Sequence, residues 1–193
     1  QLDGFEKLSI GYIELRSAEG VNVSMLEKSD VLKIKAKLAS RGMGVSAIGS
    51  PIGKIKTDED IEAHLKVAEK IFGFANELET KYVRMFSFYG AEGKSFEENK
   101  SIVYSSLEKL VRLSERYNVT LCHENEANIY GETPEKCLEL MKYFGGGLKC
   151  VFDMGNFVLD GCEPYPRAYE MLKEYIEYFH IKDSFAAGAI VPP

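Results

Sequence analysis

The chain has 193 residues, of which 45% are apolar and 28% charged, so it is long and apolar enough to bury a sizeable core. Its net charge of -6 comes from acids and lysines mixed along the chain, which leaves no basic stripe to follow a phosphate backbone. We therefore expect a globular protein with no nucleic-acid partner.

The cysteine pattern and the hydropathy suggest where the protein resides. No CxxC pair or short disulfide framework is formed by the four cysteines, Cys122, Cys137, Cys150 and Cys162. No apolar run approaches the roughly 20 residues that span a bilayer, and no basic-then-apolar leader begins the chain. These features predict a soluble cytoplasmic protein with no membrane partner, although a mature secreted chain would also lack a leader.

A helix that contains Leu2, Phe5 and Leu8 is predicted at the start of the chain, before the first of six short apolar runs. Each run turns polar at its carboxyl end and predicts a buried strand. The runs are GYIELR (11–16), GVSAIGS (44–50), KYVRMFSFY (81–89), VTLCHENE (119–126), LKCVFDMGN (148–156) and YFHIKDS (178–184). The aromatic cluster at 86–89 is interpreted as core.

Helical segments are predicted between the strands. Residues 58–79 place apolar side chains three and four positions apart, which gives one apolar face to pack on a sheet. Two more helices, over 97–116 and 134–144, connect to the next strands by short links, and the glycines at 145–147 end the second. Three patterns mark helix starts: Thr57 with Asp60, Ser95 with Glu98, and Thr133 with Pro134.

Alternating helices and continuously apolar strands predict an α/β fold with parallel strands covered by helices. The spacing fits both a (β/α)8 TIM barrel and an open doubly wound sheet. No GxGxxG or GxxxxGK[ST] motif is present, so nucleotide-binding versions of the open sheet lose support. Because no strand precedes the first helix and the chain stops in a loop, we expect residues 1–193 to form one partial barrel domain that lacks the first and last strands.

Three polar residues follow apolar runs on three successive predicted strands: Glu124, Asp153 and His180. The carboxyl ends of parallel strands meet at one face of a barrel, so these side chains should converge. Two carboxylates and one imidazole predict a divalent-metal site that favours Mn²⁺, Mg²⁺ or Co²⁺, with Zn²⁺ possible. Taken singly, the residues also fit a helix cap or surface acid, an Asx-turn and a core histidine, respectively.

The other two histidines are interpreted as structural. His64 lies inside a predicted helix between polar neighbours, which indicates a structural or solvated side chain. His123 should point away from Glu124, because successive side chains on a strand face opposite sides, and a packing role is expected for it.

The motifs CHENE (122–126), VFDMGN (151–156) and FHIKD (179–183) resemble, in this order and spacing, the sugar phosphate isomerase/epimerase family with the xylose-isomerase-like TIM barrel, which is related to AP endonuclease family 2. The resemblance covers strands two to seven of that barrel. It implies that Glu124, Asp153 and His180 hold a divalent metal, with a fourth ligand, a Glu of the eighth strand, expected beyond Pro193.

The resemblance also implies the chemistry of a metal-dependent sugar isomerase or epimerase. The metal polarises a carbonyl and stabilises an enediolate, while a carboxylate moves the neighbouring C–H proton. Glu124 would be one of two proton-transferring glutamates, and the other is expected beyond Pro193. The candidate substrate-binding residues are Arg84, Asn156, Lys182 and Asp183, although Arg84 and Lys182 equally fit structural ion pairs.

Two positions depart from the ketose 3-epimerases: Asn156 replaces a His and Ala186 replaces an Arg. Three histidines are too few for the trinuclear zinc site of the related endonuclease IV. A lyase of the inosose dehydratase type begins with the same proton abstraction and stays an alternative, as does a non-catalytic sugar-binding barrel. The implied partner is a small sugar or sugar-derived substrate, and a homo-oligomer stays possible.

Overall fold

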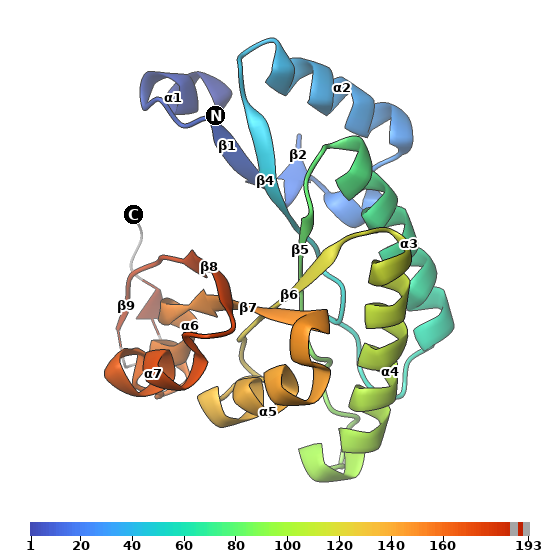
Figure 1. Cartoon of the computed structure of the whole chain (residues 1–193), viewed down its shortest axis with the longest axis vertical. Coiled ribbons are helices and arrows are strands. Elements are labelled where there is room, and N and C mark those ends of the chain that lie inside the picture. The colour runs from blue at the N-terminus through green and yellow to red at the C-terminus, as the bar shows by residue number, and fades with distance from the viewer. Residues whose placement is uncertain (186–188, 191–193) are drawn as a thin grey trace.

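The computed structural model describes residues 1–185 and 189–190. Its centre is a parallel six-stranded sheet whose strands follow one another in chain order. The strands are β1 (Tyr12–Leu15), β4 (Gly44–Gly49), β5 (Tyr82–Met85), β6 (Thr120–Glu124), β7 (Leu148–Asp153) and β8 (Ile176–His180). They correspond to the six predicted apolar runs. The sheet curls into an open half-barrel with β1 and β8 at its edges (Figure 1).

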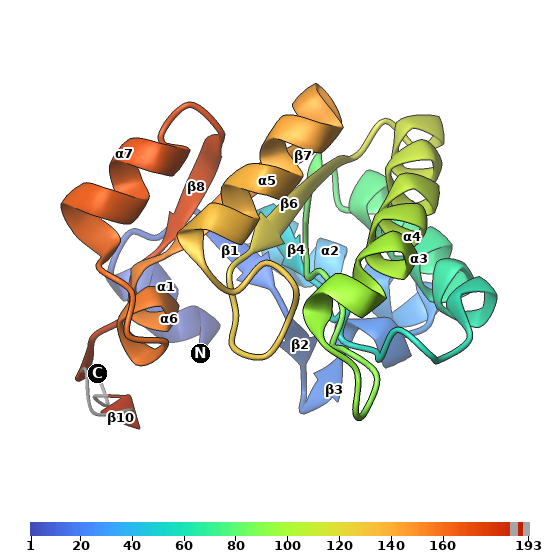
Figure 2. The ribbon, with the colours of Figure 1, turned by 90° about the horizontal axis from the view of Figure 1, so that it is seen from below.

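Helices lie along the convex face of this sheet (Figure 1). They are α2 (Lys28–Ala39), α3 (Ile61–Glu77), α4 (Phe96–Arg116), α5 (Pro134–Phe144) and α7 (Tyr169–Leu172). Figure 2 shows α4, α5 and α7 outside β6, β7 and β8. Helices on the convex face of a curled parallel sheet are the arrangement of a barrel, and this selects the barrel over the open doubly wound sheet.

The helix that follows β4 shows why the helices pack this way. The predicted apolar stripe of α3 is buried, with Ile71, Phe72 and Ala75 inaccessible to solvent. Phe86 and Phe88 are buried as well, as predicted, but they lie in the loop after β5, because the strand ends at Met85.

Two of the three predicted helix starts are confirmed and one is corrected. Asp60, not Thr57, caps α3, because its carboxylate reaches the amides of the first turn and Thr57 instead donates its hydroxyl proton to the buried Asn99. The confirmed starts are Ser95 with Glu98 at α4, and Thr133 with Pro134 at α5.

Several short elements complete the described chain. The predicted first helix is present as α1 (Leu2–Lys7), and the glycines after α5 form the turn η2 (Gly145–Gly147). The remaining short elements are the hairpin β2 (Ser17–Ala18) and β3 (Val21–Asn22), η1 (Val23–Met25), α6 (Met154–Leu159), η3 (Pro164–Ala168), and the pair β9 (Ser184–Phe185) and β10 (Ala189–Ile190).

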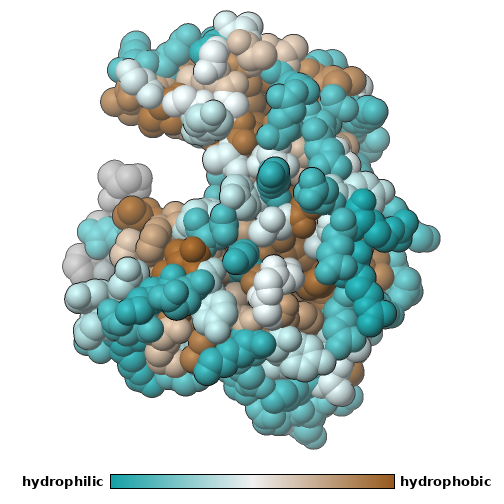
Figure 3. All heavy atoms as spheres, viewed as in Figure 1, coloured by the Kyte–Doolittle hydropathy of each residue, from teal (hydrophilic) through white to brown (hydrophobic). Residues whose placement is uncertain are grey.

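The half-barrel is open on the side between its two edge strands. The space-filling view shows this opening as a hollow between the part of the molecule that carries β1 and the part that carries β8 (Figure 3). The side chains on the concave face of the sheet therefore line an accessible space. Within the part of the chain that the structure describes, no helix is both long enough and apolar enough to cross a membrane.

Candidate metal centre

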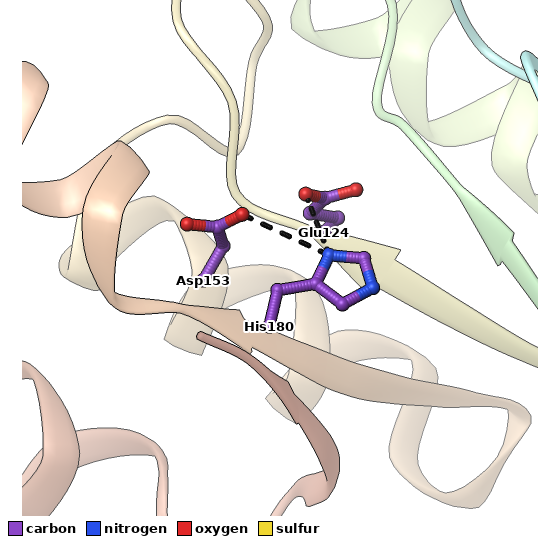
Figure 4. Close-up of side chains that lie close together, drawn as sticks. All are labelled: Glu124, Asp153 and His180. Carbon is purple, nitrogen blue, oxygen red and sulfur yellow. Dashed lines mark hydrogen bonds and ion pairs between the residues drawn. The ribbon is translucent and has the colours of Figure 1, made fainter. Parts of the chain in front are cut away.

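Glu124, Asp153 and His180 are the last residues of β6, β7 and β8, and the structure brings them together. One donor atom from each lies within 4.8 Å of the other two. His180 Nδ1 is 3.0 Å from Glu124 Oε1 and 3.7 Å from Asp153 Oδ2 (Figure 4). Both carboxylates are almost fully buried. The strand ends thus form a compact cluster of two oxygen donors and one nitrogen donor.

Asp153 has two roles at once, because its two oxygens face different ways. Oδ1 accepts a hydrogen bond of 2.8 Å from the Asn156 amide and so caps α6. Oδ2 faces His180 and lies 3.0 Å from Lys182 Nζ. The Asx-turn that the sequence also allowed for Asp153 is therefore present, and it uses only one of the two carboxylate oxygens. The other oxygen faces the cluster.

Asn125, which the sequence analysis did not select, joins the loops that follow β6 and β7. Its side-chain nitrogen donates to the Asp153 carbonyl at 3.0 Å, and its side-chain oxygen accepts from the Asp153 amide at 3.0 Å. The Asn156 side chain donates to the Asn125 carbonyl at 2.7 Å. Because Asn125 is fully buried, these hydrogen bonds have no water to compete with, and they fix Asp153 relative to Glu124.

Arg84 and Glu14 complete the concave side of the cluster. Arg84 Nη1 donates to Glu124 Oε2 at 2.7 Å, which leaves Oε1 of that carboxylate facing His180. Glu14 on β1 places Oε2 2.7 Å from His180 Nε2. The sequence analysis missed Glu14, although a charged residue between apolar neighbours on a buried strand was a usable signal.

The remaining candidate substrate-binding residues surround Asp153. Lys182 Nζ donates to Asn156 Oδ1 at 2.6 Å, and a Cβ at Gly155 would come within 2.4 Å of the Lys182 stem. Asp183 is exposed and accepts a hydrogen bond from the Ser184 amide. The substrate-binding roles of Arg84, Asn156, Lys182 and Asp183 stay predictions.

The carboxylates around His180 favour the protonated form of its imidazole. Burial lowers the pKa of His180, but hydrogen bonds with Asp153, Glu124 and Glu14 outweigh it and raise that pKa to about 11. Burial raises the pKa of Asp153, but hydrogen bonds from His180 and the Asn156 amide outweigh it and lower that pKa to about 2. Acidic side chains that favour a positive charge at this position are typical of a site that holds a cation.

The other two histidines lie outside this cluster, as the sequence predicted. His123 is fully buried, with Nε2 2.9 Å from Ser87 Oγ, and burial lowers its pKa to about 3. His64 Nε2 accepts a hydrogen bond of 2.8 Å from the Gly53 amide, and burial lowers its pKa too. Both imidazoles are therefore neutral parts of the packing.

The family model described as xylose isomerase-like TIM barrel matches residues 4–190. The chain belongs to this family. The match confirms the resemblance drawn from the sequence and the barrel class of the fold. Two expectations for this xylose isomerase-like barrel fall outside the described residues: the ligand and second acid beyond Pro193, and the effect of Ala186.

Solved structures with similar folds include a xylose isomerase-like TIM barrel protein from Mycobacterium smegmatis in complex with magnesium (19% identity, TM-score 0.75), which covers 94% of this chain and 65% of that one. The probable 3-DHS dehydratase AsbF from Bacillus anthracis has 20% identity and a TM-score of 0.77, with 94% of this chain and 66% of that chain covered. A D-tagatose 3-epimerase-like protein has 20% identity and a TM-score of 0.76, with 95% of this chain and 72% of that chain covered.

This chain thus spans about two thirds of the first two proteins. At these identities the structural likeness shows the fold alone. A comparison with curated protein sequences gave no match.

Proposed function

We propose that this chain carries three metal ligands of a divalent-metal-dependent sugar isomerase or epimerase. The observation that carries the proposal is the convergence of Glu124, Asp153 and His180 within 4.8 Å at three consecutive strand ends. Two carboxylates and one imidazole suit Mn²⁺, Mg²⁺ or Co²⁺, and Zn²⁺ is also possible. The magnesium in the similar Mycobacterium smegmatis protein supports a divalent ion.

The donor set fits such an ion because each of the three residues turns one donor atom toward the other two. Arg84 occupies Glu124 Oε2, and the Asn156 amide occupies Asp153 Oδ1. The other oxygen of each carboxylate faces His180 Nδ1. When bound, the ion would polarise a substrate carbonyl and lower the cost of forming the enediolate.

The chain's own residues would supply the proton transfer and part of the substrate contact. Glu124 takes the proton from the carbon next to the carbonyl, with its carboxylate oriented by Arg84. Lys182 is half-buried beside Asp153 and offers an ammonium to a hydroxyl or anionic group of the substrate. Arg84, Asn156 and Asp183 are proposed as further substrate contacts. The substrate class is a small sugar or a sugar-derived ketone.

A lyase is the second candidate, and the structural likeness to a probable dehydratase supports it. A dehydratase would use the same abstraction by Glu124 and would then expel a hydroxyl from the next carbon. A non-catalytic sugar-binding barrel is the third candidate. A cytoplasmic location is proposed because all four cysteines are free thiols. A homo-oligomer stays a proposal with no interface assigned.

Deuterium exchange tests the proposal. The protein is incubated in D₂O with Mn²⁺ or Mg²⁺ and a panel of ketoses, polyol-derived ketones and hydroxypyruvate, and deuterium uptake is read by mass spectrometry. Metal binding is measured in parallel by calorimetry. Glu124→Gln is the test variant. Glu139→Gln is the control, because Glu139 is also an ion-paired, hydrogen-bonded glutamate but lies on α5 among tyrosines.

We expect exchange beside the carbonyl with the wild type and Glu139→Gln, and none with Glu124→Gln. An accompanying isomer or epimer would identify an isomerase, and loss of water would identify a dehydratase. Exchange that survives in Glu124→Gln would contradict the role of Glu124 as base. A wild-type protein that binds no metal and exchanges nothing would contradict the enzyme proposal and favour the sugar-binding barrel.

A further inference from the structure

Glu14 contacts the imidazole of His180 from the side opposite to the two candidate metal-ligating carboxylates. Its Oε2 lies 2.7 Å from Nε2, whereas Glu124 Oε1 and Asp153 Oδ2 lie 3.0 and 3.7 Å from Nδ1. A neutral imidazole carries one N–H and one lone pair on different nitrogens, and the hydrogen bond at one nitrogen selects which of them is free. The position of Glu14 therefore bears on which nitrogen is presented to a metal.

We propose that Glu14 is a positioning residue that keeps the His180 proton on Nε2 and so directs the lone pair of Nδ1 at the metal. This inference rests on the proposed metal site and adds to it a residue that is not a ligand. Histidines that bind metals commonly donate their second N–H to a carboxylate or carbonyl, which fixes the ring orientation and strengthens the donor.

Arg84 connects Glu14 to the candidate ligands. Its Nε lies 4.0 Å from Glu14 Oε1, while its Nη1 donates to Glu124 Oε2 at 2.7 Å. Glu14, His180, Glu124 and Arg84 thus form a closed ring of alternating acidic and basic groups. Because a guanidinium stays charged, Arg84 attracts both carboxylates: Glu124 through a hydrogen bond, and Glu14 through charge across 4.0 Å. A change at Glu14 therefore alters the charge around the candidate ligands.

Strand β4 leaves room for the approach of Glu14 to Arg84. In the sheet, β4 lies between β1, which carries Glu14, and β5, which carries Arg84. A Cβ on Gly49 of β4 would come within 2.7 Å of Glu14 Oε1 and 3.0 Å of Arg84 Nη2. The pairing of β1 with β4 also shifts register between Ile13 and Glu14, and such irregularities re-aim side chains. Two features of the backbone thus accommodate Glu14 in this position.

The test uses Zn²⁺, which is diamagnetic, as the probe ion. Dissociation constants are measured by competition with a chromophoric chelator, and the imidazole ¹⁵N shifts of the zinc-loaded protein are recorded. Glu14→Ala removes the acceptor, and Glu14→Gln keeps an uncharged oxygen acceptor. Glu177→Gln is the control: Glu177 lines the same cavity of about 630 Å³ as Glu14 and His180, and it interacts with the Tyr82 side chain, whose pKa it raises.

For Glu14→Ala we expect the dissociation constant for Zn²⁺ to rise about 10- to 100-fold and the His180 shifts to show loss of the pure Nε2–H form. Glu14→Gln should fall between this variant and the wild type, and Glu177→Gln should stay within about twofold of the wild type. The signals of His64 and His123 report in the same spectra that each variant is folded, since neither imidazole touches the cluster.

Three results would overturn the inference. Unchanged Zn²⁺ affinity and unchanged His180 shifts in Glu14→Ala would remove the role of Glu14 and leave the metal site intact. Ligation of Zn²⁺ through Nε2 in the wild type would do the same. A wild-type protein that binds no Zn²⁺, Mn²⁺ or Mg²⁺ would instead refute the proposed metal site, and the role of Glu14 with it.

Discussion

His123 and His180 lie on the same sheet, yet their surroundings differ in charge. His123 is fully buried, and its one hydrogen-bond partner among the described residues is the Ser87 hydroxyl. The side chain of His180 is 25% exposed and lies among three carboxylates. Burial alone lowers the pKa of His123 to about 3, whereas the carboxylates around His180 outweigh its burial and raise its pKa to about 11.

The difference shows that the face of the strand, more than the residue type, decides what these histidines can do. Side chains alternate along β6, so His123 points toward the helices while the next residue, Glu124, points into the concave face. A register slip of one residue would exchange the two environments. An imidazole is thus a neutral packing group on the face toward the helices, as in His123, and a candidate ligand on the concave face, as in His180.

The largest expected effect separates the two histidines by metal affinity. His180→Asn removes one of three candidate ligands and should weaken Mn²⁺ binding by more than about a hundredfold, since loss of a residue behind a ligand already costs about 10- to 100-fold. His123→Gln should bind Mn²⁺ within about twofold of the wild type. Electron paramagnetic resonance of free Mn²⁺ measures both. An equal loss of Mn²⁺ affinity in His180→Asn and His123→Gln would contradict the distinction between a ligand and a packing histidine.

The second expected effect concerns stability in acid. The pKa of His123 is about 3 in the folded protein and about 6.5 when unfolded, so the unfolded state binds more protons as the pH falls below 6.5. Stability should therefore fall between pH 6.5 and 3, by about 2 kcal/mol at pH 5 from His123 alone. Urea unfolding at several pH values measures this.

The control for the acid effect is His123→Gln, which should lose less stability between pH 7 and pH 5 than the wild type. Some dependence should remain, because burial also lowers the pKa of His64. Equal pH slopes for the variant and the wild type would mean that His123 is not held neutral by the fold.

Much of this architecture could be predicted from the sequence. The six strands, the buried stripe of α3 and the convergence of Glu124, Asp153 and His180 follow from local periodicity and from the rule that parallel strand ends share one face. The sequence analysis assigned no helix over α2, although Val31, Ile34 and Leu38 have helical spacing and pack on the core.

The rest of the cluster depends on geometry that local patterns do not contain. Glu14 meets His180 because the sheet curls until the first and last strands of the half-barrel approach each other across the concave face, and the curvature cannot be read from either strand. Asn125 holds the Asp153 backbone through a side chain whose direction depends on the loop after β6. Both residues act across long sequence separations.

The smallest expected effect concerns two glycines, Gly131 beside His123 and Gly49 beside the Glu14 and Arg84 side chains of the cluster. A Cβ on Gly131 would meet the buried His123 ring at 2.4 Å, whereas the two tightest contacts of a Cβ on Gly49, at 2.7 and 3.0 Å, would be with the ends of the Glu14 and Arg84 side chains, followed by the Arg16 Cβ at 3.4 Å. Because such ends can shift, Gly49→Ala should change the free energy of unfolding by less than about 1 kcal/mol. It should nevertheless weaken Mn²⁺ binding, by about tenfold or less, because the shift moves groups that orient the ligands.

Gly73→Ala is the control for this last variant, since Gly73 lies within α3 and has no atom within 4 Å of its added Cβ. It should leave Mn²⁺ affinity unchanged and, as a glycine replaced inside a helix, raise stability by up to about 1 kcal/mol. Urea unfolding and Mn²⁺ titration of both variants separate packing from ligand orientation. If Gly49→Ala bound Mn²⁺ as tightly as Gly73→Ala, shifting the Glu14 and Arg84 side chains would have no effect on metal binding. The orientation of His180 would then depend on Glu124 and Asp153 and not on Glu14.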